Sequence, residues 1–194
     1  MSFISLLSNE KLIKKNAYYS RNKVIKFNPE KTKIVIAGTI TPKYHKDFNP
    51  PFYYSGKYNY LFNKLDYCLN LDGKLKQLKK DSNYCELKNA LEEKGIALID
   101  VVESCTFKGD TFVRDDELTS LCLDYGAFNG FKDKKFIVTS KNALEALKII
   151  FDKNHIDFEE GDNVFLRPQN RKGSSLKEWK DTYKECLEGI KDEK

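Results

Sequence analysis

The chain has 194 residues, of which 40% are apolar and 32% charged, and this composition favours one folded domain over residues 1–194. The formal net charge of +5 is compatible with a polyanionic partner such as nucleic acid but does not require one. No apolar run approaches ~20 residues, so no membrane partner is expected, and the N-terminal segment lacks the basic start of a signal peptide.

The N-terminal half begins with a segment in which Ser8-Asn-Glu and the Leu-Ile pair that follows are compatible with a short capped helix. An apolar run predicts the first buried strand at residues 33–37. Prolines exclude a helix over residues 39–55, which are predicted to form a loop. Apolar spacing then predicts helices at residues 58–69 and 84–94, the second ending at Gly95.

The C-terminal half continues this alternation. Further buried strands are predicted at residues 96–102, 135–139 and 163–166. Helices are predicted at residues 115–123, at 142–151 with Ser140 as the N-cap, and at 176–190. Alternating strands and helices predict an α/β fold with three α/β/α layers and a mostly parallel, four-stranded central sheet.

Five cysteines are present, an odd number without a Cys-x-x-Cys pair. This pattern favours reduced thiols in a cytoplasmic protein over a disulfide framework, a zinc site or an iron–sulfur cluster. The sequence also has no Walker-type phosphate loop, no dinucleotide fingerprint and no His-Glu-x-x-His motif. We therefore expect no metal and no cofactor.

The most informative pattern lies at the end of the first predicted strand. It reads Lys33-Ile-Val-Ile-Ala-Gly-Thr-Ile-Thr-Pro42 and is followed by Pro51-Phe-Tyr-Tyr-Ser-Gly-Lys-Tyr-Asn-Tyr-Leu-Phe62. In open α/β sheets, ligands bind outside the carboxyl ends of the strands. Aromatic faces beside amide and hydroxyl groups suit a planar heteroaromatic base, although core packing is the commoner role of such aromatics.

These two segments resemble the uracil-DNA glycosylase superfamily, and within it the branch of DNA-deoxyinosine and related glycosylases. That branch has a strand ending in Gly-Ser-x-Pro and then Phe-Tyr-Tyr-Gly-x-x-x-Asn-x-Phe-Trp. The matching residues are Gly38, Thr39, Pro42, Phe52, Tyr53, Tyr54, Gly56, Asn59 and Phe62. A second segment, Gly95-Ile-Ala-Leu-Ile-Asp-Val-Val-Glu-Ser-Cys105, is similar to the family's Gly-Ile-x-Leu-x-Asp-Val-x-x-x-Cys. A third, from Leu166 to Ser175, stands where the family has its DNA-intercalation loop.

The resemblance implies the fold of that superfamily and the hydrolysis, without a metal, of the bond between a deaminated base and its deoxyribose in DNA. The base, uracil or hypoxanthine, must first leave the stack and enter a pocket. The transition state resembles an oxocarbenium ion, and negative charge grows on the departing base. We expect a cytoplasmic monomer whose partner is DNA containing such a base.

The resemblance also implies which residues act. Asn59 is the candidate catalytic residue that positions water or substrate, the alternative being a helix cap, and Asp100 is a second candidate or a structural carboxylate. One of the two tyrosines at 53 and 54 is expected in the pocket and the other behind it. The candidate base-binding residues are Gly38, Thr39, Thr41, Phe52, Tyr53, Tyr54 and Phe62.

The third segment is basic and rich in amides, which suits contacts to phosphate. The candidate DNA-binding residues are Arg167, Gln169, Asn170, Arg171, Lys172, Ser174 and Ser175. The alternative is an exposed loop in which one of the two serines caps the last helix. The loop contains no histidine, and the turn after the first strand contains no acidic residue and is one residue longer than in the family.

These departures keep two other functions open. One is a catalytically inactive member of the same fold that binds a base, a nucleotide or DNA. The other is a different α/β enzyme that acts on a free nucleoside or nucleotide, which predicts little dependence of binding on DNA length or salt.

Overall fold

A computed structural model describes residues 3–7, 17–20, 22, 24–42, 52–54, 60–109, 114–160, 162–166 and 176–188. Its larger sheet contains four strands in the order β3 (Ile96–Asp100), β2 (Ile34–Gly38), β6 (Lys135–Val138) and β7 (Val164–Leu166). All three pairings in this sheet are parallel. The predicted parallel four-stranded sheet is therefore confirmed.

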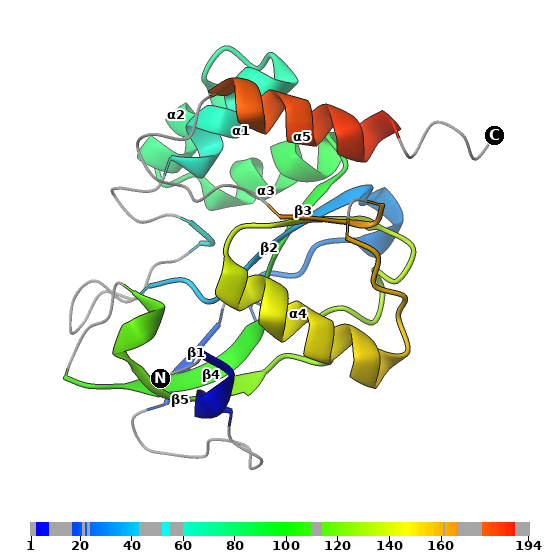
Figure 1. The fold of residues 1–194 in the computed structure, drawn as a ribbon. Helices are drawn as coiled ribbons and strands as arrows, with labels where there is room; N and C mark the ends of the chain where they lie inside the picture. Colours follow the sequence, from blue (N-terminus) through cyan, green and yellow to red (C-terminus); the bar gives the residue numbers. More distant parts are fainter. Residues whose placement is uncertain are drawn as a thin grey trace.

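Helices cover both faces of this sheet (Figure 1). One face carries α1 (Leu61–Leu69), α2 (Lys74–Lys80), α3 (Tyr84–Glu93) and α5 (Leu176–Glu188), and the other carries α4 (Lys141–Asn154). Every residue of β2 and β3 is buried, as expected for parallel strands covered on both sides. The fold is mixed α/β and compatible with three α/β/α layers.

The start of α4 shows how local sequence fixes an element beside the strand ends. The backbone N–H of Ala143 donates to Oγ of Ser140 at 3.1 Å, so the predicted N-cap is confirmed. The apolar face of the helix, including Leu147 and Phe151, is buried in the core. Ser140 follows β6 closely, so the cap places the N-terminus of α4 at the carboxyl edge of the sheet.

A second, three-stranded sheet was not predicted. It consists of β1 (Tyr18–Tyr19), β4 (Val102–Phe107) and β5 (Leu118–Leu123), in the order β1-β4-β5 and antiparallel throughout. The chain leaves the parallel sheet at Val101, whose N–H donates to the Gly38 carbonyl at 2.7 Å and whose carbonyl accepts from Asp124 N–H at 2.9 Å. The predicted strand at residues 96–102 is therefore two strands in two sheets.

The predicted helix at residues 115–123 is wrong. Only the 3-10 turn η4 (Asp115–Glu117) is helical, and the β-branched and apolar residues after it form β5. Two other short helices are described, η1 (Phe3–Leu6) and η3 (Pro29–Lys31). The predicted capped helix after Ser8 lies outside the described residues. In the part of the chain that is described, no helix has the length and apolar character needed to cross a membrane.

Candidate functional site

A pocket of about 190 Å³ lies at the carboxyl edge of the parallel sheet. The segment after β2 forms one wall from Gly38 to Pro42, and Asp100 comes from the end of β3. The other lining residues are Tyr54, Asp115, Thr139 and Ser140. Parallel pairing of β2 and β3 sets Gly38 opposite Asp100. The register of these two strands therefore brings together the segment that begins at Lys33 and the segment that begins at Gly95.

Tyr54 reaches across the end of β2. Its backbone is left-handed, with a φ of 53°, which few residues other than glycine adopt. Its hydroxyl lies 3.3 Å from Oγ1 of Thr139 and so close to Gly38 that a Cβ at residue 38 would collide with it. Burial, followed by the charge of Asp100, raises the pKa of the Tyr54 phenol, which therefore stays protonated and able to donate a hydrogen bond.

Both the backbone and the side chain of Asp100 are held by hydrogen bonds. Its backbone N–H donates to Oδ1 of Asn22 at 3.0 Å, and Nδ2 of Asn22 donates to the Asp100 carbonyl at 2.7 Å. Its carboxylate Oδ2 accepts from the N–H of Thr41 at 3.2 Å and from the Thr41 hydroxyl at 3.3 Å. Only 2% of Asp100 is exposed, so these contacts fix the orientation of a buried carboxylate inside the pocket.

Asp115 is a second carboxylate in the pocket, and the sequence analysis did not select it. Its Oδ2 accepts from the hydroxyl of Thr39 at 3.0 Å and from Nδ2 of Asn142 at 2.9 Å. Burial raises the pKa of this carboxyl above its ordinary value of 3.8. The turn after β2 has no acidic residue of its own, and η4 supplies one from 76 positions further along the chain.

Hydroxyl groups connect the two walls of the pocket. The hydroxyls of Thr39 and Ser140 lie 3.1 Å apart, and Thr39 also donates to Asp115. Ser140 caps α4, so the turn after β2, the start of α4 and η4 share one hydrogen-bond network. The predicted base-binding residues Thr39 and Thr41 each bond to one of the two carboxylates.

The other predicted aromatic residues are placed in the core. Phe52 and Phe62 are 1% and 0% exposed, and the Phe52 ring stacks on Tyr84 with centroids 5.6 Å apart. Tyr53 is 1% exposed, and its hydroxyl donates to Oδ1 of Asn22 at 2.7 Å. Because their faces are covered by protein, we assign Phe52, Tyr53 and Phe62 to core packing and not to base contact. Of the two adjacent tyrosines, Tyr54 lines the strand-end pocket.

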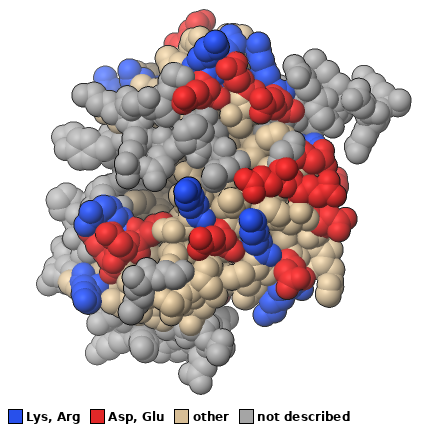
Figure 2. All heavy atoms as spheres, viewed as in Figure 1, with Lys and Arg blue, Asp and Glu red and all other residues tan. Residues whose placement is uncertain are grey.

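The remaining predicted residues lie outside the described residues. They are Asn59, Arg167, Gln169, Asn170, Arg171, Lys172, Ser174 and Ser175. On the face shown in Figure 2, basic and acidic side chains of the described residues are interspersed. The described residues on that face therefore form no continuous basic surface of the kind that binds DNA.

Comparison of the chain with known protein families, with curated proteins and with solved structures gave no match in any of the three.

Proposed function

We propose that the chain is a DNA glycosylase with a uracil-DNA glycosylase-like fold that removes a deaminated base from DNA, acting as a cytoplasmic monomer without a metal or cofactor. One observation carries the proposal: two carboxylates, Asp100 and Asp115, line the same small pocket beside Tyr54 at the carboxyl edge of a parallel sheet. Ligand sites of open α/β sheets lie at this edge. A pocket of about 190 Å³ limits the group inside it to the size of a single base.

Hydrolysis of a glycosidic bond needs an acid for the departing base and a negative charge near the sugar. The two carboxyl groups of the pocket differ in environment, so that each can take one of these roles. Positive charge develops on the sugar, and the departing base must be neutralised. Asp115, whose pKa burial raises, keeps its proton to a higher pH than an ordinary aspartate and serves as the acid. Asp100, oriented by the two donors of Thr41, serves as the carboxylate that faces the sugar.

The proposed reaction balances with water as the only co-reactant. Water attacks C1′ of the deoxyribose, and the bond from C1′ to the base breaks with its electron pair leaving on the base. Asp115 gives its proton to the base, and Asp100 accepts the proton of the attacking water. Asn59, by the resemblance, positions that water. The products are the free base and an abasic site.

This assignment favours hypoxanthine over uracil. A purine can accept a proton on its imidazole ring as it leaves, which an acid such as Asp115 can supply. Uracil departs as an anion, which a pocket lined by two carboxyl groups disfavours and which hydrogen-bond donors alone would have to stabilise. We therefore propose deoxyinosine in DNA as the preferred substrate.

The experiment is a cleavage assay on labelled oligonucleotides that carry one hypoxanthine, uracil or xanthine, single- and double-stranded, with alkali to reveal abasic sites. We expect Asp115→Asn to slow cleavage of the hypoxanthine strand by about 100-fold or more. Asn59→Ala is expected to abolish cleavage and to leave DNA binding largely intact. Asp116→Asn is the matched control, because Asp116 is the exposed neighbour of Asp115.

Two results would count against the proposal. Parental rates for both Asp115→Asn and Asn59→Ala would mean that the catalytic residues are misassigned. No cleavage of any substrate by stoichiometric protein would favour the alternative, a catalytically inactive module of the same fold that binds a base, a nucleotide or DNA. The observation that favours this alternative is that Thr41 donates two hydrogen bonds to Oδ2 of Asp100, which makes this oxygen a weaker base.

A further inference from the structure

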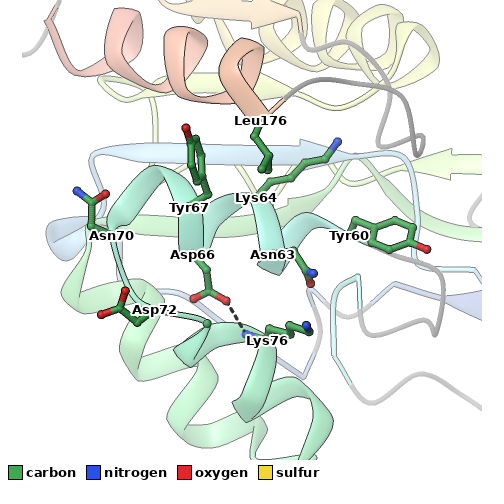
Figure 3. A pocket seen from close by; sticks show the side chains of 10 residues that line it. Tyr60, Asn63, Lys64, Asp66, Tyr67, Asn70, Asp72, Lys76 and Leu176 are labelled. Carbon is green, nitrogen blue, oxygen red and sulfur yellow. Dashed lines mark hydrogen bonds between the residues drawn. The ribbon is translucent and has the colours of Figure 1, made fainter.

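A larger cavity, of about 640 Å³, lies away from the strand-end pocket and shares no lining residue with it. It is formed by α1 with the preceding Tyr60, the turn between α1 and α2, Lys76 of α2, and the first residue of α5 (Figure 3). Its size falls in the range of cavities that bind small molecules and cofactors. Nothing in the proposed glycosylase chemistry uses it.

Apolar side chains are exposed in this cavity to an unusual degree. Tyr60, Tyr67 and Leu176 are 38%, 45% and 45% exposed, and they are three of the five large apolar side chains exposed in the described part of the chain. Nζ of Lys180 lies 5.3 Å from the centre of the Tyr67 ring. Half-exposed aromatic side chains in a concave site, one of them with a cation over one face of its ring, are typical of sites that stack a planar ligand on the remaining face.

Some polar groups of the cavity are already hydrogen-bonded within the protein, whereas others can bond to a ligand. The Asp66 carboxylate is buried and accepts from the backbone N–H groups of Leu75 and Lys76, at 2.8 and 2.9 Å, so it holds the start of α2. Within the described residues, the side-chain amides of Asn63 and Asn70 have no hydrogen-bond partner. Both amides can therefore donate to and accept from a ligand.

Charge along the cavity is uneven. The exposed Lys76 side chain lies near Asn63, and the exposed Asp72 lies near Asn70 at the other end (Figure 3). An anionic group therefore fits better beside Lys76, where the Asp66 carboxylate is already bonded to two backbone N–H groups, than beside the exposed Asp72. Nucleotides are recognised by aromatic rings that stack on the base, amides that bond to its polar edges, and lysines that contact the phosphate.

Two residues that line this cavity directly follow, in the sequence, a predicted catalytic residue and the predicted DNA-binding segment. The connections that lead to α1 and α5 leave the carboxyl ends of parallel strands, β2 and β7, so both come from the edge of the sheet that carries the strand-end pocket. Tyr60 directly follows Asn59, and Leu176 directly follows Ser175. The described wall of the cavity therefore begins, at Tyr60 and at Leu176, one residue after segments that the sequence predicts to act on DNA.

We propose that this cavity binds one nucleotide of the single strand that flanks the target base, with the base on Tyr67 or Tyr60 and the phosphate near Lys76. That the nucleotide belongs to a DNA strand rests on the proposed function. That the ligand is a nucleotide rests on the side chains that line the cavity. A free mononucleotide offers the same chemistry, so the experiment separates the two sources.

The test measures binding by fluorescence anisotropy of a labelled single-stranded oligothymidylate that contains no deaminated base. We expect Tyr67→Ala to weaken binding roughly fivefold or more, because it removes a stacking face. Lys76→Ala is expected to weaken binding at low salt and to flatten the dependence of log K on log salt by about 0.7. The matched controls are Tyr19→Ala and Lys132→Ala, since both side chains are exposed and neither lines the cavity.

The outcomes separate this site from the proposed function because the DNA is undamaged and no cleavage is needed. Binding by Tyr67→Ala and Lys76→Ala as tight as by the controls overturns the site, even in a protein that cuts deoxyinosine DNA. Binding that depends on Tyr67 supports the site, even in a protein that cuts nothing. Thymidine monophosphate that competes as well as the oligonucleotide would overturn the strand as occupant and identify a free nucleotide.

Discussion

Replacing Gly38 with alanine tests whether the close approach of Tyr54 builds the strand-end pocket. A Cβ at residue 38 would lie 2.9 Å from Cζ of Tyr54 and closer still to the hydroxyl oxygen. Tyr54 cannot remain where it is, because its ring would overlap the new atom. Its hydroxyl would then lose the contact with Thr139, and the phenol would leave the pocket.

The size of the effect follows from the cost of overpacking, about 1–3 kcal/mol for an extra carbon in a filled space. For a chain of this length, each kcal/mol lowers the melting temperature by about 2–4 °C, so Gly38→Ala is expected to lower it by roughly 2–12 °C. Gly126→Ala is the matched control, because the atom nearest to its added Cβ is 3.8 Å away. That control should stay within about 0.5 kcal/mol of the parent.

The assay is thermal denaturation of four proteins: the parent, Gly38→Ala, Tyr54→Ala and the double variant. If the added Cβ acts through the tyrosine ring, removing the ring relieves the clash, and the two substitutions couple by about 1 kcal/mol or more. Additive effects, or a melting temperature for Gly38→Ala equal to that of Gly126→Ala, would refute the assigned contact between strand end and tyrosine.

Three further predictions concern the support of the site. Asp115→Asn should raise stability at neutral pH. The reason is that folding raises the pKa of this carboxyl above 3.8, so ionising it costs more in the folded than in the unfolded chain. In thermal melts at several pH values, the gain in stability should vanish as the pH falls below 3.8. Tyr53→Phe removes the hydroxyl that donates to Oδ1 of Asn22 and to the Ile25 carbonyl, and should lower the free energy of unfolding by about 0.5–1.5 kcal/mol in urea titrations. Ser140→Ala removes the cap on Ala143 and should lower it by about 1 kcal/mol, with most restored by Ser140→Asn.

Each of these predictions has a contradicting result. A stability gain of Asp115→Asn that is the same at every pH would show that the carboxyl titrates normally in the folded protein. A parental urea midpoint for Tyr53→Phe would show that the hydrogen bond to Asn22 contributes nothing net. Equal losses for Ser140→Ala and Ser140→Asn would mean that the side chain acts through packing and not as a cap.

Local patterns in the sequence predicted the parallel sheet well. Ile34 to Ala37 and Ile96 to Ile99 are uninterrupted apolar runs, and such runs are typical of strands covered on both faces. α2 was missed because Leu75 and Leu78 are the only apolar residues in its seven, too few to show a helical period. The break at Val101 was missed because apolar residues resume directly after Asp100, and only partners distant in sequence assign the two parts to different sheets.

The candidate site was predicted in part. Gly38, Thr39, Thr41, Tyr54 and Asp100 are predicted site residues that line the pocket, because all but Tyr54 stand at strand ends that parallel pairing brings together. Asp115 gave no such signal. It opens a run of three acidic residues that resembles the start of a helix, and its place beside Thr39 depends on where β4 and β5 carry the chain. Burial of Phe52 likewise depends on Tyr84, which only the folded chain supplies.

The passage of the chain from one sheet to the other at Val101 places the pocket between two sheets that are buried to different degrees. Every residue of β2 and β3 is buried, whereas β4 and β5 each include half-buried or exposed residues. Asp100 belongs to the parallel sheet, whereas Asp115 is carried by the segment that leads into β5 of the smaller sheet. Partial opening of a protein begins in its least protected unit. Opening of the three-stranded sheet would withdraw one carboxyl and leave the other in place. We therefore expect function to be lost at a denaturant concentration below the one that unfolds the parallel sheet, with amide exchange in β5 faster than in β2.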